Sequence, residues 1–160
     1  MAANTRFAVA LHVLGFLAYA GAPVSTSEQL AASVNTNPVV IRRLLASLRE
    51  AGLVASQAGP GGGWRLERSA EDISLADVYR AIEDEPLFAM PARDPSDACD
   101  VGAHVQAVFD PLAGEAEAAL IERLEDTSIA DMVVEIALRV GPCPIDQHEI
   151  EHQPSLGAMT

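Results

Sequence analysis

The sequence predicts a mainly α-helical protein with one small β-hairpin and a long helix in its second half. Three observations lead to this fold class. Residues 37–52 contain a helix N-cap, an apolar stripe and a terminal glycine, which are typical of one amphipathic helix. Residues 53–66 contain two short β-prone runs around a glycine-rich tip, as in a hairpin. Residues 100–126 repeat apolar side chains at helical spacing, which predicts a helix packed on a partner.

The first predicted helix spans residues 5–20 and is apolar nearly all round, so it must be covered on several sides. Arg6 and the apolar run after it also fit a secretory signal peptide. However, the charged region is a single Arg, His12 interrupts the run, and cleavage would delete a core helix. The run is also too short to cross a bilayer, which needs about 20 residues. We therefore expect a cytoplasmic protein with no membrane segment.

A short helix and a tight turn are predicted next. Ser25, with Glu28 three residues later, has the capping-box pattern that opens a helix through Ser33. Residues 34–36 then form a turn before a second, longer helix. This order is the signature of a helix-turn-helix, whose second helix is a candidate for the DNA major groove.

The longer helix begins at a well-defined position, since Asn37 is a good N-cap and Pro38 suits the first helical position. Gly52 stands where a glycine commonly ends a helix. The predicted buried face consists of Ile41, Leu44, Leu45 and Leu48. With the hairpin of residues 53–66 after it, the arrangement is a winged helix-turn-helix, and the glycines of the tip allow close approach to another surface.

Two further helices are expected in the second half, after a capped helix that Ser74 and Asp77 begin. Pro111 lies inside the long helix and should kink it or start a new segment after Asp110. A last helix follows Ser128, with its predicted inward face at Ile129, Met132, Val133, Ile136 and Val140. We divide the chain into a winged helix-turn-helix DNA-binding domain (1–85), a linker or sensor loop (86–99), a dimerisation helix with a C-terminal helix (100–145) and a flexible tail (146–160).

The overall net charge of −13 argues against nucleic acid, but it conceals a division. Residues 1–68 contain six arginines and three glutamates, a net charge of +3, so the remainder carries −16. Such asymmetry suggests a half that faces phosphate and an acidic half turned away from it. The candidate DNA contacts are Ser25, Thr26, Thr36, Asn37, Val40, Arg42, Arg43, Gly61, Gly62 and Arg65. The surplus of positive charge is modest, so we expect binding to need two copies of the chain.

The two cysteines, Cys99 and Cys143, are too few for a disulfide framework and are expected to be free thiols. Cys99 has three open interpretations: a small hydrophobic residue capping the long helix, a redox-sensing thiol, or a metal ligand. His12, Cys99 and His104 match no compact metal motif, and His148 and His152 lie on a doubtful tail helix. We therefore predict no metal site. The sequence contains neither a phosphate loop nor a nucleophile elbow, so we predict no enzyme.

Residues 44–56 and 59–66 closely resemble the recognition helix and wing of the Rrf-two family of bacterial winged-helix transcription regulators. The segments 73–78, 99–102 and 128–132 recur in the order of that family, so the resemblance covers roughly residues 5–140. It implies a homodimer in which the long helix crosses its twin and two winged helices reach successive major grooves. The dimerisation residues that it suggests are Val101, Val105, Val108, Leu112 and Leu120.

The resemblance also raises the question of a cofactor. Iron–sulfur members of the family hold their cluster with three closely spaced cysteines before the long helix, whereas this chain has only Cys99 there. A cluster normally needs about four protein ligands, mostly thiolates, so we expect none. The wing departs from the family as well, because Ala58 stands where an Arg is common. Arg65 should therefore matter more.

Two functions compete at this stage. The first is a sequence-specific DNA-binding transcription regulator, expected to be a repressor, that acts as a homodimer on double-stranded DNA with a palindromic operator. The second is a protein-interaction module that uses the acidic half and whose winged helix no longer binds DNA; its main support is the small number of basic residues. A thiol-, metal- or small-molecule-sensing regulator is a variant of the first.

Overall fold

The computed structural model describes residues 4–20, 24–83, 87–88 and 99–140 of the 160-residue chain. Its elements confirm the predicted class, mainly helical with a two-stranded antiparallel hairpin. In chain order they are α1 (Asn4–Tyr19), α2 (Ser27–Val34), α3 (Pro38–Glu50), β1 (Val54–Gln57), β2 (Gly63–Leu66), the 3-10 turn η1 (Ala70–Asp72), α4 (Leu75–Ile82), α5 (Asp100–Glu125) and α6 (Ile129–Val140).

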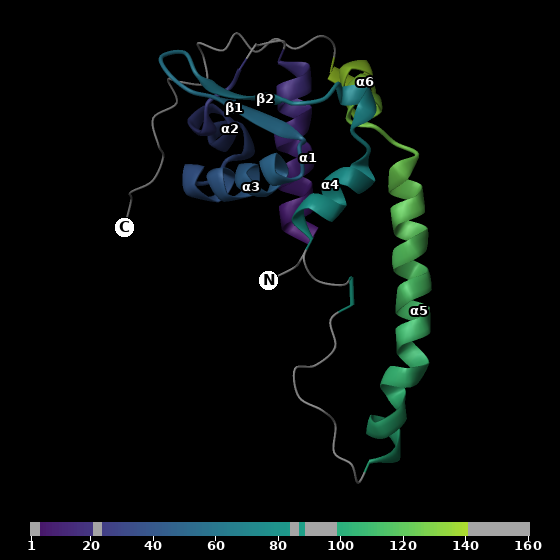
Figure 1. Ribbon diagram of the computed structural model, residues 1–160. Helices are drawn as coiled ribbons and strands as arrows, with labels where there is room; N and C mark the ends of the chain where they lie inside the picture. Colours follow the sequence, from purple (N-terminus) through teal and green to yellow (C-terminus); the bar gives the residue numbers. More distant parts are fainter. Residues whose placement is uncertain (1–3, 21–23, 84–86, 89–98, 141–160) are drawn as a thin grey trace, which may run out of the picture.

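The first four helices, the hairpin and α6 gather into one body, which we call the head, while α5 extends well beyond it (Figure 1). The head has a single hydrophobic core to which α1, α2, α3, α4, β1 and α6 all contribute. All four residues of the predicted α3 stripe are buried in it. Burial of such side chains stabilises the fold by about 1.5–3 kcal/mol each, which is why this stripe orients α3. Fully buried members include Val13, Leu14, Leu30, Ile41, Leu45, Leu48, Val78, Ile82 and Ile129.

The start of α2 differs from the prediction by one residue. Thr26, and not Ser25, is the N-cap, and its hydroxyl accepts a hydrogen bond from Gln29 N at 3.2 Å. Gln29 Oε1 in turn accepts one from Thr26 N at 2.8 Å, which completes the capping box. At the other end of α2, Asn35 adopts a left-handed conformation (φ 57°), which Asn tolerates better than most residues. The start of α3 is as predicted, with Asn37 as N-cap and Pro38 at its first position.

The hairpin pairs β1 with β2 in antiparallel register, from Val54 opposite Leu66 to Gln57 opposite Gly63. A third segment joins its root. Ser25 N donates to Trp64 O at 2.9 Å and Trp64 N donates to Ser25 O at 2.8 Å. The residue before α2 therefore forms a bridge to β2, which fixes the wing to the beginning of the helix-turn-helix.

A second backbone bridge joins the two halves of the chain, between Ser74 and Ser128. Leu75 N donates to Thr127 O at 2.8 Å, and Ile129 N donates to Ile73 O at 2.9 Å. The segments that lead into α4 and α6 are thus hydrogen-bonded to each other. Since Ile129 is fully buried in the head core, the predicted division after residue 85 runs through one core.

The long helix α5 continues through Pro111 as one element, so the predicted alternative of a new segment after Asp110 is wrong. The predicted inward face of α6 is only partly correct. Ile129, Met132 and Val133 belong to the core or pack against it, but Ile136 and Val140 are exposed in the single chain. The predicted tail, Cys143 and most of the predicted linker lie outside the described residues. Within the described ranges, no helix is both long and apolar enough to cross a membrane.

Candidate nucleic-acid interface

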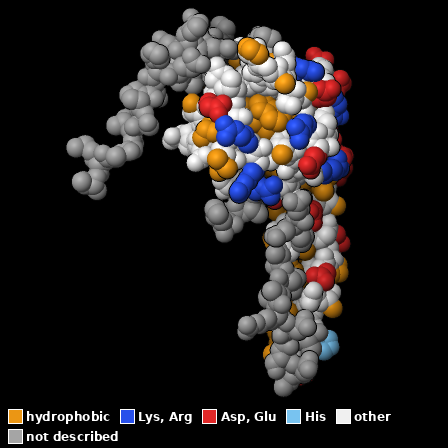
Figure 2. Space-filling model, turned by 60° about the vertical axis from the view of Figure 1, so that its left-hand side comes forward, with side chains coloured by type: hydrophobic (Ala, Val, Ile, Leu, Met, Phe, Trp, Pro, Cys, Tyr) orange, Lys and Arg blue, Asp and Glu red, His pale blue; other side chains and the backbone are white. Residues whose placement is uncertain are grey.

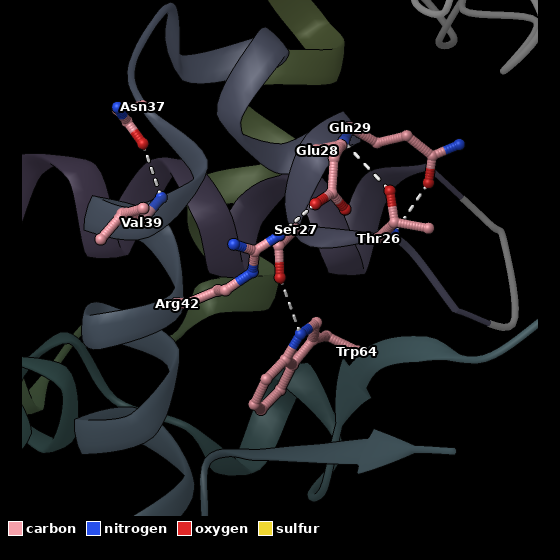
Figure 3. A network of polar contacts seen from close by, with 8 residues as sticks. All are labelled: Thr26, Ser27, Glu28, Gln29, Asn37, Val39, Arg42 and Trp64. Atoms are coloured by element: carbon pink, nitrogen blue, oxygen red, sulfur yellow. Dashed lines mark hydrogen bonds and ion pairs between the residues drawn. The ribbon is translucent and has the colours of Figure 1, made fainter. Parts of the chain in front are cut away.

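The N-terminal turn of α3 presents backbone and apolar groups at the surface of the head. Asn37 Oδ1 accepts a hydrogen bond from Val39 N at 2.8 Å (Figure 3). Val39 and Val40 are 50% and 51% exposed, beside the half-buried Thr36. A recognition helix contacts base edges mainly with its N-terminal residues, and apolar side chains suit the thymine methyl group. Val39 was missed from the sequence, although the buried Ile41 two positions later already placed it on the outer side.

Two arginines follow on the same helix, with different surroundings. Arg42 Nη2 donates to Glu28 Oε1 of α2, forming an ion pair between the two helices of the motif (Figure 3). Arg43 is exposed to solvent. The predicted pair of arginines therefore consists of one side chain held by a carboxylate and one that extends from the surface. Glu28, expected from the sequence to cap α2, has this other role.

The two predicted DNA contacts before α2, Ser25 and Thr26, also differ in their surroundings. Ser25 is 2% exposed and its backbone is paired with Trp64, so its side chain cannot touch DNA and we correct that assignment. Thr26 is half-buried and caps α2. Both residues were plausible from the sequence. They differ in burial and role because Ser25 pairs with Trp64 of the hairpin, so that Thr26 becomes the N-cap of α2.

The wing is joined to α2 through side chains as well as backbone. Trp64 Nε1 donates to Ser27 Oγ at 3.2 Å, with the indole lying between β2 and α2 (Figure 3). Trp64 also packs against the head core, which gives its ring a structural role at the wing root. Wing, α2 and α3 consequently form one connected surface: Trp64 meets Ser27, and the next residue, Glu28, meets Arg42.

The tip of the wing carries the predicted glycines. Gly61 has φ +74°, a conformation that other residues rarely adopt. A Cβ on Gly62 would lie 2.3 Å from the backbone oxygen of Gln57, so only glycine fits there. Arg65, on the exposed side of β2, donates to Leu66 O at 3.0 Å and pairs with Glu67 at 3.4 Å. Its guanidinium lies beside the wing and remains about half exposed.

Figure 2 shows basic and hydrophobic side chains side by side on the head, with acidic side chains at the edge of the head as well as along the extension below it. Such a mixture of cations and apolar groups suits DNA, because cations meet phosphates and apolar groups meet bases.

A histidine side chain joins α1 to the helix-turn-helix. His12 of α1 shares a hydrogen bond between its Nε2 and Ser33 Oγ of α2, at 2.9 Å. Partial burial lowers the pKa of His12 below its usual value of 6.5, because desolvation disfavours the charged imidazolium. The lowered pKa favours the neutral imidazole of His12 in the folded chain.

Comparison with known proteins shows the family to which the chain belongs. The sequence profile of the Rrf2 family, described as an iron-dependent transcriptional regulator, matches residues 3–135. YwnA of Bacillus subtilis (strain 168), named as an HTH-type transcriptional regulator, is 37% identical over 131 residues, covering 81% of this chain and 96% of YwnA. The chain belongs to the Rrf2 family of transcriptional regulators.

Solved structures support the Rrf2 fold. A protein described as a DNA binding protein is 34% identical, with a TM-score of 0.64 over 80% of this chain and 98% of the other. The IscR of T. potens also has a TM-score of 0.64, over 85% of this chain and 88% of its own, at 23% identity. The relatives of the chain are regulators, in agreement with the prediction that it is not an enzyme.

The iron in the family description would need a ligand set, and the described residues near the start of α5 supply one cysteine and one histidine. Cys99 is exposed and caps α5, its sulfur accepting from Gly102 N at 3.4 Å. His104 Nδ1 is hydrogen-bonded to Asp100 O at 2.8 Å. Among the residues that the structure describes, no three His, Cys, Asp or Glu side chains are grouped to hold a metal. The whole sequence has two cysteines, whereas iron–sulfur clusters normally take about four protein ligands, mostly thiolates.

The α5 helix of this Rrf2 protein carries the predicted dimerisation stripe. Four of its five residues, Val101, Val105, Val108 and Leu112, are 46–73% exposed in the single chain. Leu120, nearer the head, is half-buried. Apolar residues in a row on an isolated helix leave a large apolar area in water, which marks an interaction surface.

Proposed function

We propose that this chain is a cytoplasmic homodimeric repressor of transcription that binds a palindromic operator in double-stranded DNA through α3 and the wing. The observation that carries the proposal is the exposed N-terminal turn of α3, where Val39, Val40, Arg42 and Arg43 adjoin a wing fastened to the same motif. Bidentate arginine contacts to guanine and apolar contacts to thymine are the common means of reading the major groove. The family to which the chain belongs supports it.

The exposed stripe on α5 supports the homodimer. Pairing this face with its twin would bury the four apolar residues and present two heads to one DNA molecule. Two recognition helices then read half-sites about 34–36 Å apart. The second head also compensates for the modest positive charge of the first, since each additional phosphate contact raises affinity.

The decisive experiment selects binding sites from a random pool of duplex DNA with the full-length protein, followed by gel shifts over a salt titration. We expect enrichment of a palindrome, and binding that weakens steeply with salt because counterions are released. A scrambled duplex of equal length and composition is the control. Equal affinity for both duplexes, or no retained DNA, would instead favour the protein-interaction module.

We further propose that the signal is not received by an iron–sulfur cluster, because the chain has too few thiolates. Protein purified without oxygen should show no visible absorption of the kind such clusters give, and absorption of that kind would overturn the proposal. Cys99 is then the candidate for a redox-sensitive thiol. Mild peroxide should weaken operator binding in the wild type and not in Cys99→Ser; equal effects in both would exclude Cys99.

A further inference from the structure

The ion pair between Glu28 and Arg42 joins the two helices of the proposed reading surface. Glu28 lies in the first turn of α2 and Arg42 in the second turn of α3, and Arg42 Nη2 donates to Glu28 Oε1. Figure 3 shows the carboxylate of Glu28 and the guanidinium of Arg42 facing each other across the gap between the helices. An acidic side chain thus lies directly beside an arginine that is expected to meet DNA.

The pair is too exposed to be explained by stability. The side chains of Arg42 and Glu28 are 54% and 60% exposed, and ion pairs of that exposure contribute little to folding. A carboxylate at a surface that faces phosphates also repels the ligand. Glu28 therefore lowers the general attraction of the head for DNA, and any benefit must arise in the choice between DNA sequences.

The first turn of α2, which carries Glu28, is fixed by hydrogen bonds on both sides of that residue. The preceding residue, Ser27, is buried and accepts the indole hydrogen bond from Trp64 at 3.2 Å. The following residue, Gln29, closes the capping box with Thr26. Glu28 is accordingly presented by a turn fixed to both the wing and the core, which suits a residue that orients another side chain.

We propose that Glu28 is a positioning residue for sequence discrimination: its carboxylate holds Arg42 so that the remaining N–H groups face a base and are withheld from phosphate. The inference rests on the proposed DNA-binding function. An arginine has five N–H donors in a planar fork, so donors remain for guanine O6 and N7 while Glu28 accepts from another. Specificity is a difference between two affinities, and Glu28 increases it by weakening contacts that any DNA sequence could make.

The test uses full-length protein and the operator obtained by selection from random duplex DNA. Dissociation constants are measured for that operator and for one with each G·C pair substituted in turn, with wild type, Glu28→Gln, Arg42→Ala and the double variant. Glu28→Gln should bind scrambled DNA more tightly and lose discrimination by about three- to tenfold at one base pair, within the range of coupled neighbours. In the Arg42→Ala background, Glu28→Gln should change discrimination at that base pair by less than about twofold.

Glu50→Gln is the matched control, because it removes the same charge from an exposed glutamate at the end of α3. If Glu28 acted only through net charge, both variants would change binding alike, and this outcome would overturn the proposal. Unchanged discrimination in Glu28→Gln, or an equal change with and without Arg42, would overturn it too. Thermal unfolding of Glu28→Gln should match the wild type, since the pair is exposed; a large loss of stability would instead indicate a structural role. Selection that enriches no DNA with the wild type would refute the DNA-binding function itself.

Discussion

At the scale of single residues, the two arginines of α3 show how position and environment together define a role. Arg42 is held by Glu28, whereas Arg43 extends into solvent one residue later. A free guanidinium can approach either a phosphate or a guanine. Arg43 is therefore the better residue for testing whether α3 reads DNA at all.

Replacing Arg43 by Ala should weaken operator binding by about 1–3 kcal/mol if the side chain contacts a guanine. The loss should be confined to sequences that carry the contacted base, and thermal unfolding should be unchanged because Arg43 is exposed. Gel shifts with the selected operator measure the effect. Arg139→Ala, which removes an equal charge from exposed α6, is the control and should bind as the wild type; an equal loss in both would show that only net charge matters.

His12 gives a pH dependence with a definite sign. Its pKa is lowered in the folded state by partial burial, whereas the unfolded chain has the usual value of about 6.5. Below that pH the unfolded state binds more protons than the folded one, so the stability supplied by neutral His12 is lost as pH falls.

Urea unfolding between pH 7.5 and 5.5 should therefore show a falling midpoint in the wild type and a smaller fall in His12→Gln, which can keep a hydrogen bond to Ser33. Asp131, whose pKa is lowered by hydrogen bonds from Ser128, titrates at lower pH and does not interfere. His104→Gln controls for the removal of a histidine. Equal pH dependence of His12→Gln and wild type would show that the imidazole contributes nothing.

Some residue roles could not be predicted from the sequence, for a physical reason. Ser25 and Thr26 are both good N-caps, and Glu28 and Gln29 stand three residues after them. Local chemistry therefore does not decide which of the two caps α2. The deciding contact is the backbone bridge between Ser25 and Trp64, which is 39 residues away in the sequence. The Glu28–Arg42 pair likewise follows no helical period, since it depends on how α2 packs on α3.

At the scale of elements, the wing depends on how closely its root approaches α2. A Cβ on Gly63 would lie 2.7 Å from the backbone oxygen of Ser25, which is closer than side chains normally come. The small residue at this place therefore allows the bridge between β2 and the segment before α2.

Gly63→Ala should break that bridge, lower the free energy of unfolding by about 1–3 kcal/mol and weaken operator binding because the wing moves relative to α3. Chemical denaturation and gel shifts measure the two effects. Gly114→Ala is a matched control: it lies inside α5 with open space around the added Cβ. There alanine should stabilise the helix by up to about 1 kcal/mol. Unchanged binding by Gly63→Ala would show that the bridge does not position the wing.

The elements themselves were largely predictable. Caps, glycines and the apolar stripe gave α3 and the hairpin almost to the residue, because each signal acts over a few positions. The face of α6 was less well predicted, since Ile136 and Val140 are apolar and in phase with Ile129 and yet exposed. Periodicity indicates an apolar face but does not say whether the same chain covers it.

At the scale of the whole molecule, the described part of the chain leaves the apolar stripe of α5 exposed. The stripe of α5 is as apolar as a core and largely in water. Our proposal of a homodimer accounts for it, because a twin copy supplies the same face in return.

Leu112→Glu should convert the dimer to a monomer, since a charge would be buried in the interface at a cost of several kcal/mol. Light scattering coupled to size-exclusion chromatography measures the mass, and operator affinity should fall in parallel. Gln106→Glu adds the same charge on an exposed residue of α5 outside the stripe and is the control. A dimer that survives Leu112→Glu would place the interface elsewhere.

The bridge between Ser74 and Ser128 has a consequence for how the protein can be divided. Because Ile129 completes the core of the head, a chain cut after α4 would open a cavity where that side chain lies and expose the apolar walls around it. Folding of the DNA-facing part therefore requires α5, which runs from its far end back to α6 (Figure 1), to bring Ile129 to the head. The winged helix-turn-helix and α5 therefore belong to one cooperative structure. A substitution that destabilises either of them should lower the stability of both.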